Sequence, residues 1–413
     1  MPTLHLDRWL LFAARFVRLF AYGSLSVVLV FYLIGIGFTP SQTGWLLSLT
    51  LVGDTVVSLV MTTCADRLGR RRMLLAGAML MAAAGFVFAV TSNFWLLLLA
   101  ATIGVISPSG HEVGPFLPIE QAALSHVVAD RNRTEVFAWY TLTGSLATAL
   151  GSLFAGVISQ NVDNAAISPV GSYRAVVIVY AALGIVLAAV FVGLSHRTEV
   201  MGYGDSRSAT TFIRRLSGLD RSRTVVFKLS ALFALDSFGG GFVVQAFLAY
   251  WFHLRFGIDV AALGTIFFWA NIFAGFSALL ASRLAARIGL IKTMVFTHLP
   301  SNILLILVPL MPSLWSATVV LLVRFSISQM DVPARQSYVM AVVSPAERAA
   351  AGGITGVART IGAALSPLLV GLMFARPRLI SLPFFLAGTL KIIYDLGLYQ
   401  QFVSARVPEE VRQ

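Results

Sequence analysis

Long runs of apolar residues, separated by short polar or charged stretches, fill almost the whole chain of 413 residues. A run of about twenty apolar residues crosses a bilayer as an α-helix, which satisfies its own backbone hydrogen bonds there. About twelve such runs can be placed, six on each side of a hydrophilic break at residues 196–223. The pattern predicts an all-α integral membrane protein of about twelve transmembrane helices in two pseudo-symmetric six-helix bundles.

The expected spans of the first half are 10–37, 43–64, 73–92, 94–121, 134–160 and 174–195. Those of the second half are 224–254, 261–284, 293–311, 314–337, 350–375 and 380–402. Residues 1–195 should form one bundle, and residues 224–413 the other bundle with a short cytoplasmic tail. Residues 196–223 should link them in the cytoplasm.

Composition agrees with this pattern, since 58% of residues are hydrophobic, 12% are charged and the mean hydropathy is +0.85. The net charge of +12 is not a nucleic-acid signal, because arginines gather in alternate loops. The loop with Arg67, Arg70, Arg71 and Arg72 is one example, whereas the loop at 38–43 has no charge. This bias predicts that both termini lie in the cytoplasm.

The cysteine content, the first apolar run and the residue usage indicate the type of membrane protein and its source. Cys64 is the single cysteine, so an intramolecular disulfide is excluded. Leu10 to Ile36 is longer than the core of a signal peptide, which predicts a retained first span. Arginine outnumbers lysine and alanine is abundant, a usage typical of high-GC bacteria, so a bacterial inner membrane is expected. The protein is also expected to be a monomer.

An internal repeat relates the two halves. A shift of 215 positions places Pro118 on Pro333 and Gln121 on Gln336, and a shift of 218 places Gly23 on Gly241. Repeated halves of this kind predict a binding site between them near the middle of the bilayer.

The loop after the second span reads Asp66-Arg67-Leu68-Gly69-Arg70-Arg71-Arg72. In this loop the sequence resembles the major facilitator superfamily, whose signature is Gly, three residues, then Asp-Arg/Lys-x-Gly-Arg/Lys-Arg/Lys. Thr62 replaces the first glycine of the signature, and a degraded copy occupies 286–292. The resemblance implies the two-bundle fold of that family and transport by alternating access.

The same resemblance implies a cytoplasmic gate that latches the two halves. Its residues would be Asp66, Arg67, Gly69, Arg70 and Arg71, joined by Arg133 and Arg348 after the fourth and tenth spans. Gly69 permits a tight turn, and Asp66 at a helix C-terminus needs a cationic neighbour. The alternative is that the arginines only fix topology.

The fifth span, from Ala147 to Gly156, resembles the antiporter motif Gly-x-x-x-Gly-Pro-x-x-Gly-Gly with several replacements. Gly362 to Gly371 in the eleventh span keeps the proline of this motif as Pro367. Small residues at this spacing also let helices approach closely, so helix packing is an equal alternative to an antiport signature.

Ionisable residues within spans are functional candidates, because charge in the hydrocarbon region is costly. In the tenth span, Arg324, Ser328, Asp331 and Arg335 share one helical face and are expected to border the cavity. Arg324 should stabilise the charged form of Asp331. An ion pair that only locks the helix is the alternative.

Three further spans contain such candidates. Arg359 lies on a polar stripe of the eleventh span, and Asp54 lies between Thr50 and Ser58 in the second. Asp236, beside three glycines in the seventh span, is the counterpart of Arg18 in the first, with which it could form a fixed ion pair.

The fourth span is expected to be broken. It contains Pro108, Gly110, Pro115 and Pro118, which an ordinary helix does not accommodate. Glu120 lies just beyond this break, at the position that the repeat relates to Arg335, so equivalent sites have opposite charge.

The sequence thus indicates a secondary transporter of a small solute, with no enzyme activity and no cofactor. It has no Walker loop, metal-protease motif or nucleophile elbow, and a single His-Glu pair does not make a metal site. Proton coupling is expected through Asp54, His111, Glu112 or Asp236, with export by antiport ahead of uptake by symport or uniport. The many buried arginines favour an anionic solute, and a membrane receptor or sensor is the remote alternative.

The gate leads to a testable prediction. Asp66→Asn removes one charge from the switch and none from the substrate site, so transport should fall while membrane insertion stays intact. Flux measured over a full concentration series checks this, and unchanged flux would contradict the gate.

Overall fold

The computed structural model describes residues 2–110, 115–128, 133–164, 169–195, 222–343 and 347–403. These residues form helices and connecting turns without any β-strand. The predicted linker at 196–223 lies outside the described residues except for its last two positions. By packing, the chain divides into two compact units: unit 1 is Met1–Tyr203 with Val244–Ile272, and unit 2 is Gly204–Val243 with Phe273–Gln413.

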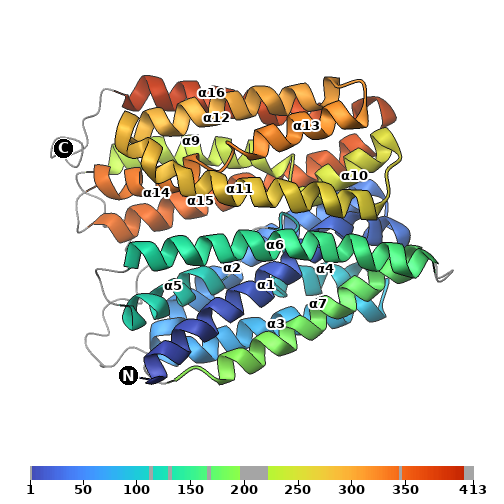
Figure 1. Cartoon of the computed structure of the whole chain (residues 1–413), viewed down its shortest axis with the longest axis horizontal. Helices are drawn as coiled ribbons and strands as arrows, with labels where there is room; N and C mark the ends of the chain where they lie inside the picture. The colour runs from blue at the N-terminus through green and yellow to red at the C-terminus, as the bar shows by residue number, and fades with distance from the viewer. Residues whose placement is uncertain are drawn as a thin grey trace. The chain divides into compact units, whose positions relative to one another are not determined.

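Unit 1 contains all the described helices of the first half, which Figure 1 labels. They are α1 (Pro2–Gly35), α2 (Pro40–Leu68), α3 (Arg70–Val90), α4 (Phe94–Ile103), α5 (Phe116–Val127), α6 (Arg133–Asn164) and α7 (Pro169–Val192). This unit also includes α10 (Gln245–Phe256) and the first part of α11 (Val260–Ile288).

Unit 2 contains the rest of α11 and the remaining helices of the second half. They are α9 (Arg223–Gly241), α12 (Leu290–Leu307), α13 (Leu314–Phe325), α14 (Asp331–Val342), α15 (Arg348–Phe374) and α16 (Leu382–Phe402). Two short 3₁₀ helices, Val308–Leu310 and Pro377–Leu379, lie in its turns.

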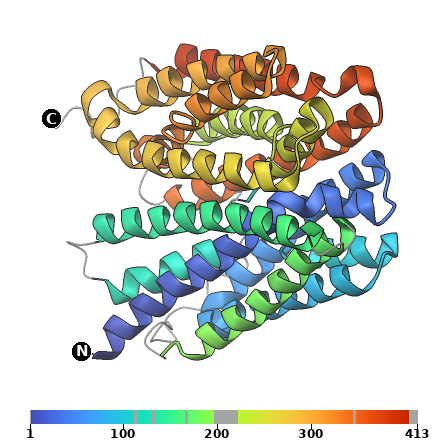
Figure 2. The same cartoon turned by 45° about the vertical axis from the view of Figure 1, so that its right-hand side comes forward.

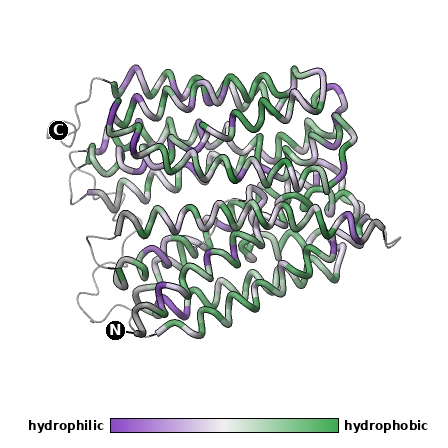
Figure 3. The backbone as a smooth tube through the Cα atoms, in the orientation of Figure 1, coloured by the Kyte–Doolittle hydropathy of each residue, from purple (hydrophilic) through white to green (hydrophobic). Residues whose placement is uncertain are grey.

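Within the described residues, ten helices are long and apolar enough to cross a membrane, and apolar residues cover most of their length (Figure 3). Phe94–Ile103 and Leu314–Phe325 are two shorter apolar helices. Each is followed by a second helix, α5 or α14, so the fourth and tenth spans consist of two pieces. The fold class and the break in the fourth span are confirmed, whereas the break at Ser326–Met330 in the tenth was not predicted.

The helices of each unit run side by side in the same order of neighbours (Figures 1 and 2). In the first half, the first span packs most extensively on the fifth and sixth spans, and the third packs on the sixth. The equivalent pairs α9 with α15, α9 with α16, and α12 with α16 dominate the second half. The shift of 215 positions also superimposes the bounds of α5 on those of α14, as expected from an internal repeat.

The turn after the second span has the predicted conformation. Gly69 has φ +101° between α2 and α3, a backbone region that favours glycine. Gly289 has φ +86° in the corresponding turn between α11 and α12. The copy of the loop motif in the second half has therefore kept its turn while losing most of its charges.

The small residues of the fifth and eleventh spans lie at helix contacts. A Cβ atom on Gly151 of α6 would lie 2.1 Å from the backbone oxygen of Phe20 on α1. A Cβ atom on Gly362 of α15 would lie 2.3 Å from the backbone oxygen of Ala234 on α9. Close packing of the first span on the fifth, in both halves, therefore accounts for these glycines.

Gly151→Ala should destabilise the protein, because the added methyl group meets backbone that cannot move independently. We expect a loss of about 1–3 kcal/mol and a lower thermal midpoint in detergent. The matched control is Gly353→Ala on α15, where a Cβ atom would meet nothing within 4 Å. Equal midpoints for the two variants would contradict the proposed close packing.

Candidate functional site

The break in the fourth span is a strained segment of unit 1. After Gly104 ends α4, Val105 has φ +56°, a left-handed conformation that is costly for a β-branched residue. Tyr180 of α7 donates a hydrogen bond to the backbone oxygen of Val105 at 3.0 Å. Gly110, with φ +69°, lies in the same break, and Thr148 of α6 donates to its backbone oxygen at 3.2 Å. Neighbouring helices therefore stabilise the non-helical backbone.

The N-terminus of α10 packs against this break. The backbone N–H of Ala246 donates to the oxygen of Pro108 at 3.1 Å. The side-chain amide of Gln245 donates to Ser26 of α1 at 2.9 Å and to Ser152 of α6 at 3.1 Å. Asn271 of α11 donates to the amide oxygen of Gln245 at 3.1 Å. We call these contacts of Gln245 with Ser26, Ser152 and Asn271 the Gln245 node.

A buried ion pair joins the first and fourth spans of unit 1. The guanidinium of Arg18 donates two hydrogen bonds to the carboxylate of Glu120, at 2.5 and 2.7 Å, and both side chains are fully buried. The hydroxyl of Tyr140 on α6 also donates to Glu120. The Arg18 guanidinium lies over the ring of Phe116, 4.7 Å from its centroid. The charges therefore compensate each other directly.

Unit 2 has an ion pair at the equivalent positions with the charges exchanged. Asp236 of α9 accepts a hydrogen bond from Arg335 of α14 at 3.0 Å. The repeat relates Asp236 to Arg18 and Arg335 to Glu120, so each half joins its first and fourth spans by a buried acid and base. The ion pair that the sequence proposed between Arg18 and Asp236 is corrected, because each residue instead pairs inside its own unit.

Around Asp236 lies a larger polar cluster that sequence reasoning missed. Lys391 of α16 donates to Asp236 at 2.6 Å, and Nε2 of His298 on α12 lies 3.7 Å from the same carboxylate oxygen. Nδ1 of His298 lies 2.8 Å from Asp395 of α16, and the Asn302 amide donates to Asp395 at 2.9 Å. The spacing of Lys391 and Asp395, four residues apart within an apolar span, was the available sequence signal. This group is called the Asp236 cluster below.

The tenth span differs from the predicted continuous stripe. Asp331 pairs with Arg335 at 3.3 Å rather than with Arg324. The physical reason is the break at Ser326–Met330, which interrupts the helical periodicity between Arg324 and Asp331.

Arg324 and Arg359 lack ion-pair partners within the described part of the chain. The Nε atoms of both side chains are buried without a hydrogen-bond acceptor. Arg324 ends α13 immediately before the break, with its guanidinium 5.2 Å from the ring centroid of Phe325. Arg359 of α15 interacts electrostatically with Arg335, Asp236 and Asp331. These two cations are the strongest described candidates for holding an anion.

The remaining predicted residues divide into described and undescribed groups. Asp54 is buried in α2 and interacts electrostatically with Tyr180. At the gate, Arg70 is buried, and Arg71 donates to the backbone oxygen of Val192 at the end of α7 at 2.5 Å. Outside the described residues lie His111 and Glu112, and also the side chains of Asp66, Arg67, Arg133 and Arg348. Within the described residues, no group of three or more His, Cys, Asp or Glu side chains could hold a metal ion.

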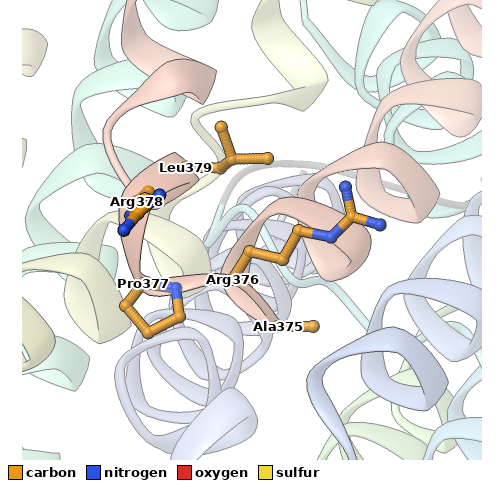
Figure 4. A pocket seen from close by; sticks show the side chains of 5 residues that line it. All are labelled: Ala375, Arg376, Pro377, Arg378 and Leu379. Atoms are coloured by element: carbon orange, nitrogen blue, oxygen red, sulfur yellow. The ribbon is translucent and has the colours of Figure 1, made fainter.

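A surface pocket of about 470 Å³ lies at the turn between α15 and α16. A single stretch, Ala375 to Leu379, lines it, and the side chains of Arg376 and Arg378 point in different directions (Figure 4). The pocket does not include any predicted site residue, so the buried clusters are the better candidate site.

Comparison with known sequences identifies one family over most of the chain. The profile described as Major Facilitator Superfamily matches residues 11–367. Uncharacterized membrane protein YJR124C of Saccharomyces cerevisiae is 30% identical over 98% of this chain and 97% of its own length. The Na(+), Li(+), K(+)/H(+) antiporter of Planococcus maritimus is 28% identical over 29% of this chain and 28% of its own. Quinolone resistance protein NorA of Staphylococcus aureus is 26% identical over 35% and 36% respectively.

Solved structures show the same fold. The nucleoside transporter NupG has a TM-score of 0.75 at 15% identity and covers 96% of this chain and 98% of its own. An inward-facing, occupied bacterial homolog of the human lysosomal transporter Spinster has a TM-score of 0.76 at 16% identity. That match covers 98% of this chain and 99% of the homolog.

The ion pair of unit 1 gives a stability prediction. Glu120→Gln leaves the Arg18 guanidinium buried without a counter-charge, so we expect a loss of about 3–5 kcal/mol and a lower thermal midpoint. The triple variant Arg18→Met, Glu120→Leu, Tyr140→Phe removes both charges and the tyrosine hydroxyl together, so it should be more stable than Glu120→Gln alone. Unfolding in detergent measures both, and an unchanged midpoint for Glu120→Gln would contradict the importance of the pair.

Proposed function

We propose that this chain, which belongs to the Major Facilitator Superfamily, is a proton-coupled secondary transporter that moves a small solute by alternating access. The observation that carries the proposal is the Asp236 cluster, where ionisable side chains are buried between membrane-spanning helices. Burial of charged side chains in an apolar environment costs free energy, so a functional role is the default interpretation. The broken fourth and tenth spans support the same interpretation, because interrupted helices commonly form transporter binding sites.

Export by antiport is the favoured direction. It is supported by the partial matches to the Planococcus antiporter and to the quinolone resistance protein. Uptake by symport and uniport are the alternatives. Symport moves protons in the same direction as the solute, whereas antiport moves them in the opposite direction. Uniport moves the solute without any proton movement.

An anionic solute is the favoured substrate class. Arg324 and Arg359 provide guanidinium groups without ion-pair partners in the described residues, and a guanidinium matches the geometry of a carboxylate. Quinolones carry a carboxyl group, so the match to the resistance protein agrees with this chemistry.

The cytoplasmic gate belongs to the same proposal. The turn at Gly69 and the contact of Arg71 with the end of α7 support a structured element there. The roles of Asp66, Arg67, Arg133 and Arg348, the cytoplasmic termini, the bacterial inner membrane and the monomeric state stay predictions.

Transport can be tested in proteoliposomes that enclose a pH-sensitive dye. Nalidixic acid, a quinolone carboxylate, and the chlorides of sodium, lithium and potassium are added outside in turn. We expect solute-dependent proton movement with at least one of these probes, and none in liposomes without protein. Solute flux without proton movement would support uniport, and the absence of flux with every probe would contradict the proposal.

The anion hypothesis predicts a specific effect of the two arginines. Arg324→Gln and Arg359→Gln each remove a charge-assisted hydrogen bond worth about 1.5–3 kcal/mol, which corresponds to a KM for nalidixic acid raised roughly ten- to a hundredfold. Arg255→Gln, at an exposed position on α10, is the matched control and should leave KM unchanged. An unchanged KM in both test variants would contradict anion binding at these residues.

A further inference from the structure

The Asp236 cluster contains a linear chain of exchangeable groups that connects three helices. It runs from Lys391 to Asp236 at 2.6 Å, from Asp236 to Nε2 of His298 at 3.7 Å, and from Nδ1 of His298 to Asp395 at 2.8 Å. Side-chain exposure is 10% for Lys391 and 0% for Asp395. The chain therefore leads from its most accessible member to a fully buried carboxylate.

The histidine lies between two acids in a geometry that depends on its protonation. Both ring nitrogens face carboxylate oxygens, and only the imidazolium can donate a hydrogen from both. Asp395 can accept from Nδ1 both in the imidazolium and in the neutral ring that keeps its hydrogen on Nδ1, and the Asn302 amide donates to the other oxygen of Asp395. The site therefore has hydrogen-bond partners for both the charged and the neutral ring.

The equivalent pair in unit 1 does not have this property. Arg18 keeps its proton at any accessible pH, and Glu120 already accepts hydrogen bonds from Arg18 and Tyr140. Loss of the Glu120 charge would leave a fully buried arginine without its counter-charge. The two halves therefore combine one permanent ion pair with one cluster that can exchange a proton.

The helices around the Asp236 cluster carry further charged or titratable side chains. Helix α14 contributes Asp331, Arg335 and Tyr338, and α16 contributes Tyr394, whose ring centroid is 5.8 Å from that of His298. Arg359 of α15 interacts with Asp236, and Arg324 is the single charged residue of α13. Asp236 already pairs with two cations, Arg335 and Lys391, whereas His298 and Asp395 pair with each other.

We propose that the His298–Asp395 pair holds the proton that drives transport, and that Asp236 transfers this proton between the pair and water. On release, the N–H bond at Nε2 breaks and an O–H bond forms on Asp236, which then loses the proton to water. The neutral imidazole keeps its hydrogen on Nδ1, directed at Asp395. On uptake the same steps run in reverse. This inference rests on the proposed function and names the proton site within it.

The test measures conformation, so it does not require a known substrate. In the full chain with Cys64→Ser, spin labels are attached to cysteines introduced at Leu68 and Ala286, which are exposed ends of α2 and α11. Double electron–electron resonance then measures the distribution of distances between the two labels at pH values from about 5 to about 8. We expect pH to redistribute the distances, and His298→Gln or Asp395→Asn to remove most of this response.

A second histidine supplies the matched control. His253 of α10 is exposed and contacts the backbone oxygen of Ile258, so His253→Gln should keep the full response. Thermal midpoints in detergent establish that each variant is folded, and the isosteric Asp395→Asn keeps the test valid if His298→Gln does not fold. A folded Asp395→Asn variant with the full pH response would overturn the proposal. A wild-type protein whose label-to-label distances do not change with pH would also overturn it.

The same variants separate this inference from the proposed function. In proteoliposomes, His298→Gln and Asp395→Asn should lose accumulation driven by a pH gradient while retaining solute exchange at equal pH. If the wild type carries solute and proton but both variants still accumulate it, the proton site is wrong and transport stands. If the wild type carries no probe at all, the proposed function fails, whatever the distance measurements show.

Discussion

A charge in the hydrocarbon region of a membrane is costly without a partner, and this constraint explains the buried ion pairs of both units. Arg18 is satisfied by Glu120, and Asp236 by Arg335 and Lys391. In each unit, the first span is thereby fixed to the piece of the fourth that follows its break. A short helix such as α5 or α14 has too little apolar length to be held by the bilayer alone. The buried ion pairs supply an attachment that the shortened helices need.

Exchange of the charges between the halves shows what the repeat has to preserve. The position of acid and base is reversed, yet the helices that they join are the same. Attraction between opposite charges is independent of which helix carries which sign. What differs is the surroundings, since Glu120 has a tyrosine beside it and Asp236 has a lysine and a histidine. The same pairing of helices is therefore compatible with two different sets of polar neighbours.

Sequence patterns predicted the spans, the repeat and the break in the fourth span, because each depends on local composition. Pro108, Gly110 and Pro115 leave little choice about that break. The tenth span breaks at Ser326–Met330, where the sequence contains neither glycine nor proline, so no local signal was available. His298, Asn302 and Asp395 were missed as a site for another reason. Their significance comes from two helices meeting, which a single sequence does not encode in a local pattern. The pairing of Asp331 with Arg335 is instead a local i,i+4 contact on α14, and it was missed because the break that separates Arg324 from this face was not predicted.

The seventh span has a further consequence, because its two helices belong to different units. Helix α9 packs within unit 2, and α10 is held in unit 1 by the Gln245 node. Under alternating access as proposed, any movement of α10 relative to α1, α6 and α11 would have to break these hydrogen bonds. Each hydrogen bond contributes about 1 kcal/mol, which corresponds to roughly a fivefold change in the ratio of two states. Under that proposal, polar substitutions around one glutamine would change the relative occupancy of the two access states in small steps, without changing the residues proposed to bind solute or proton.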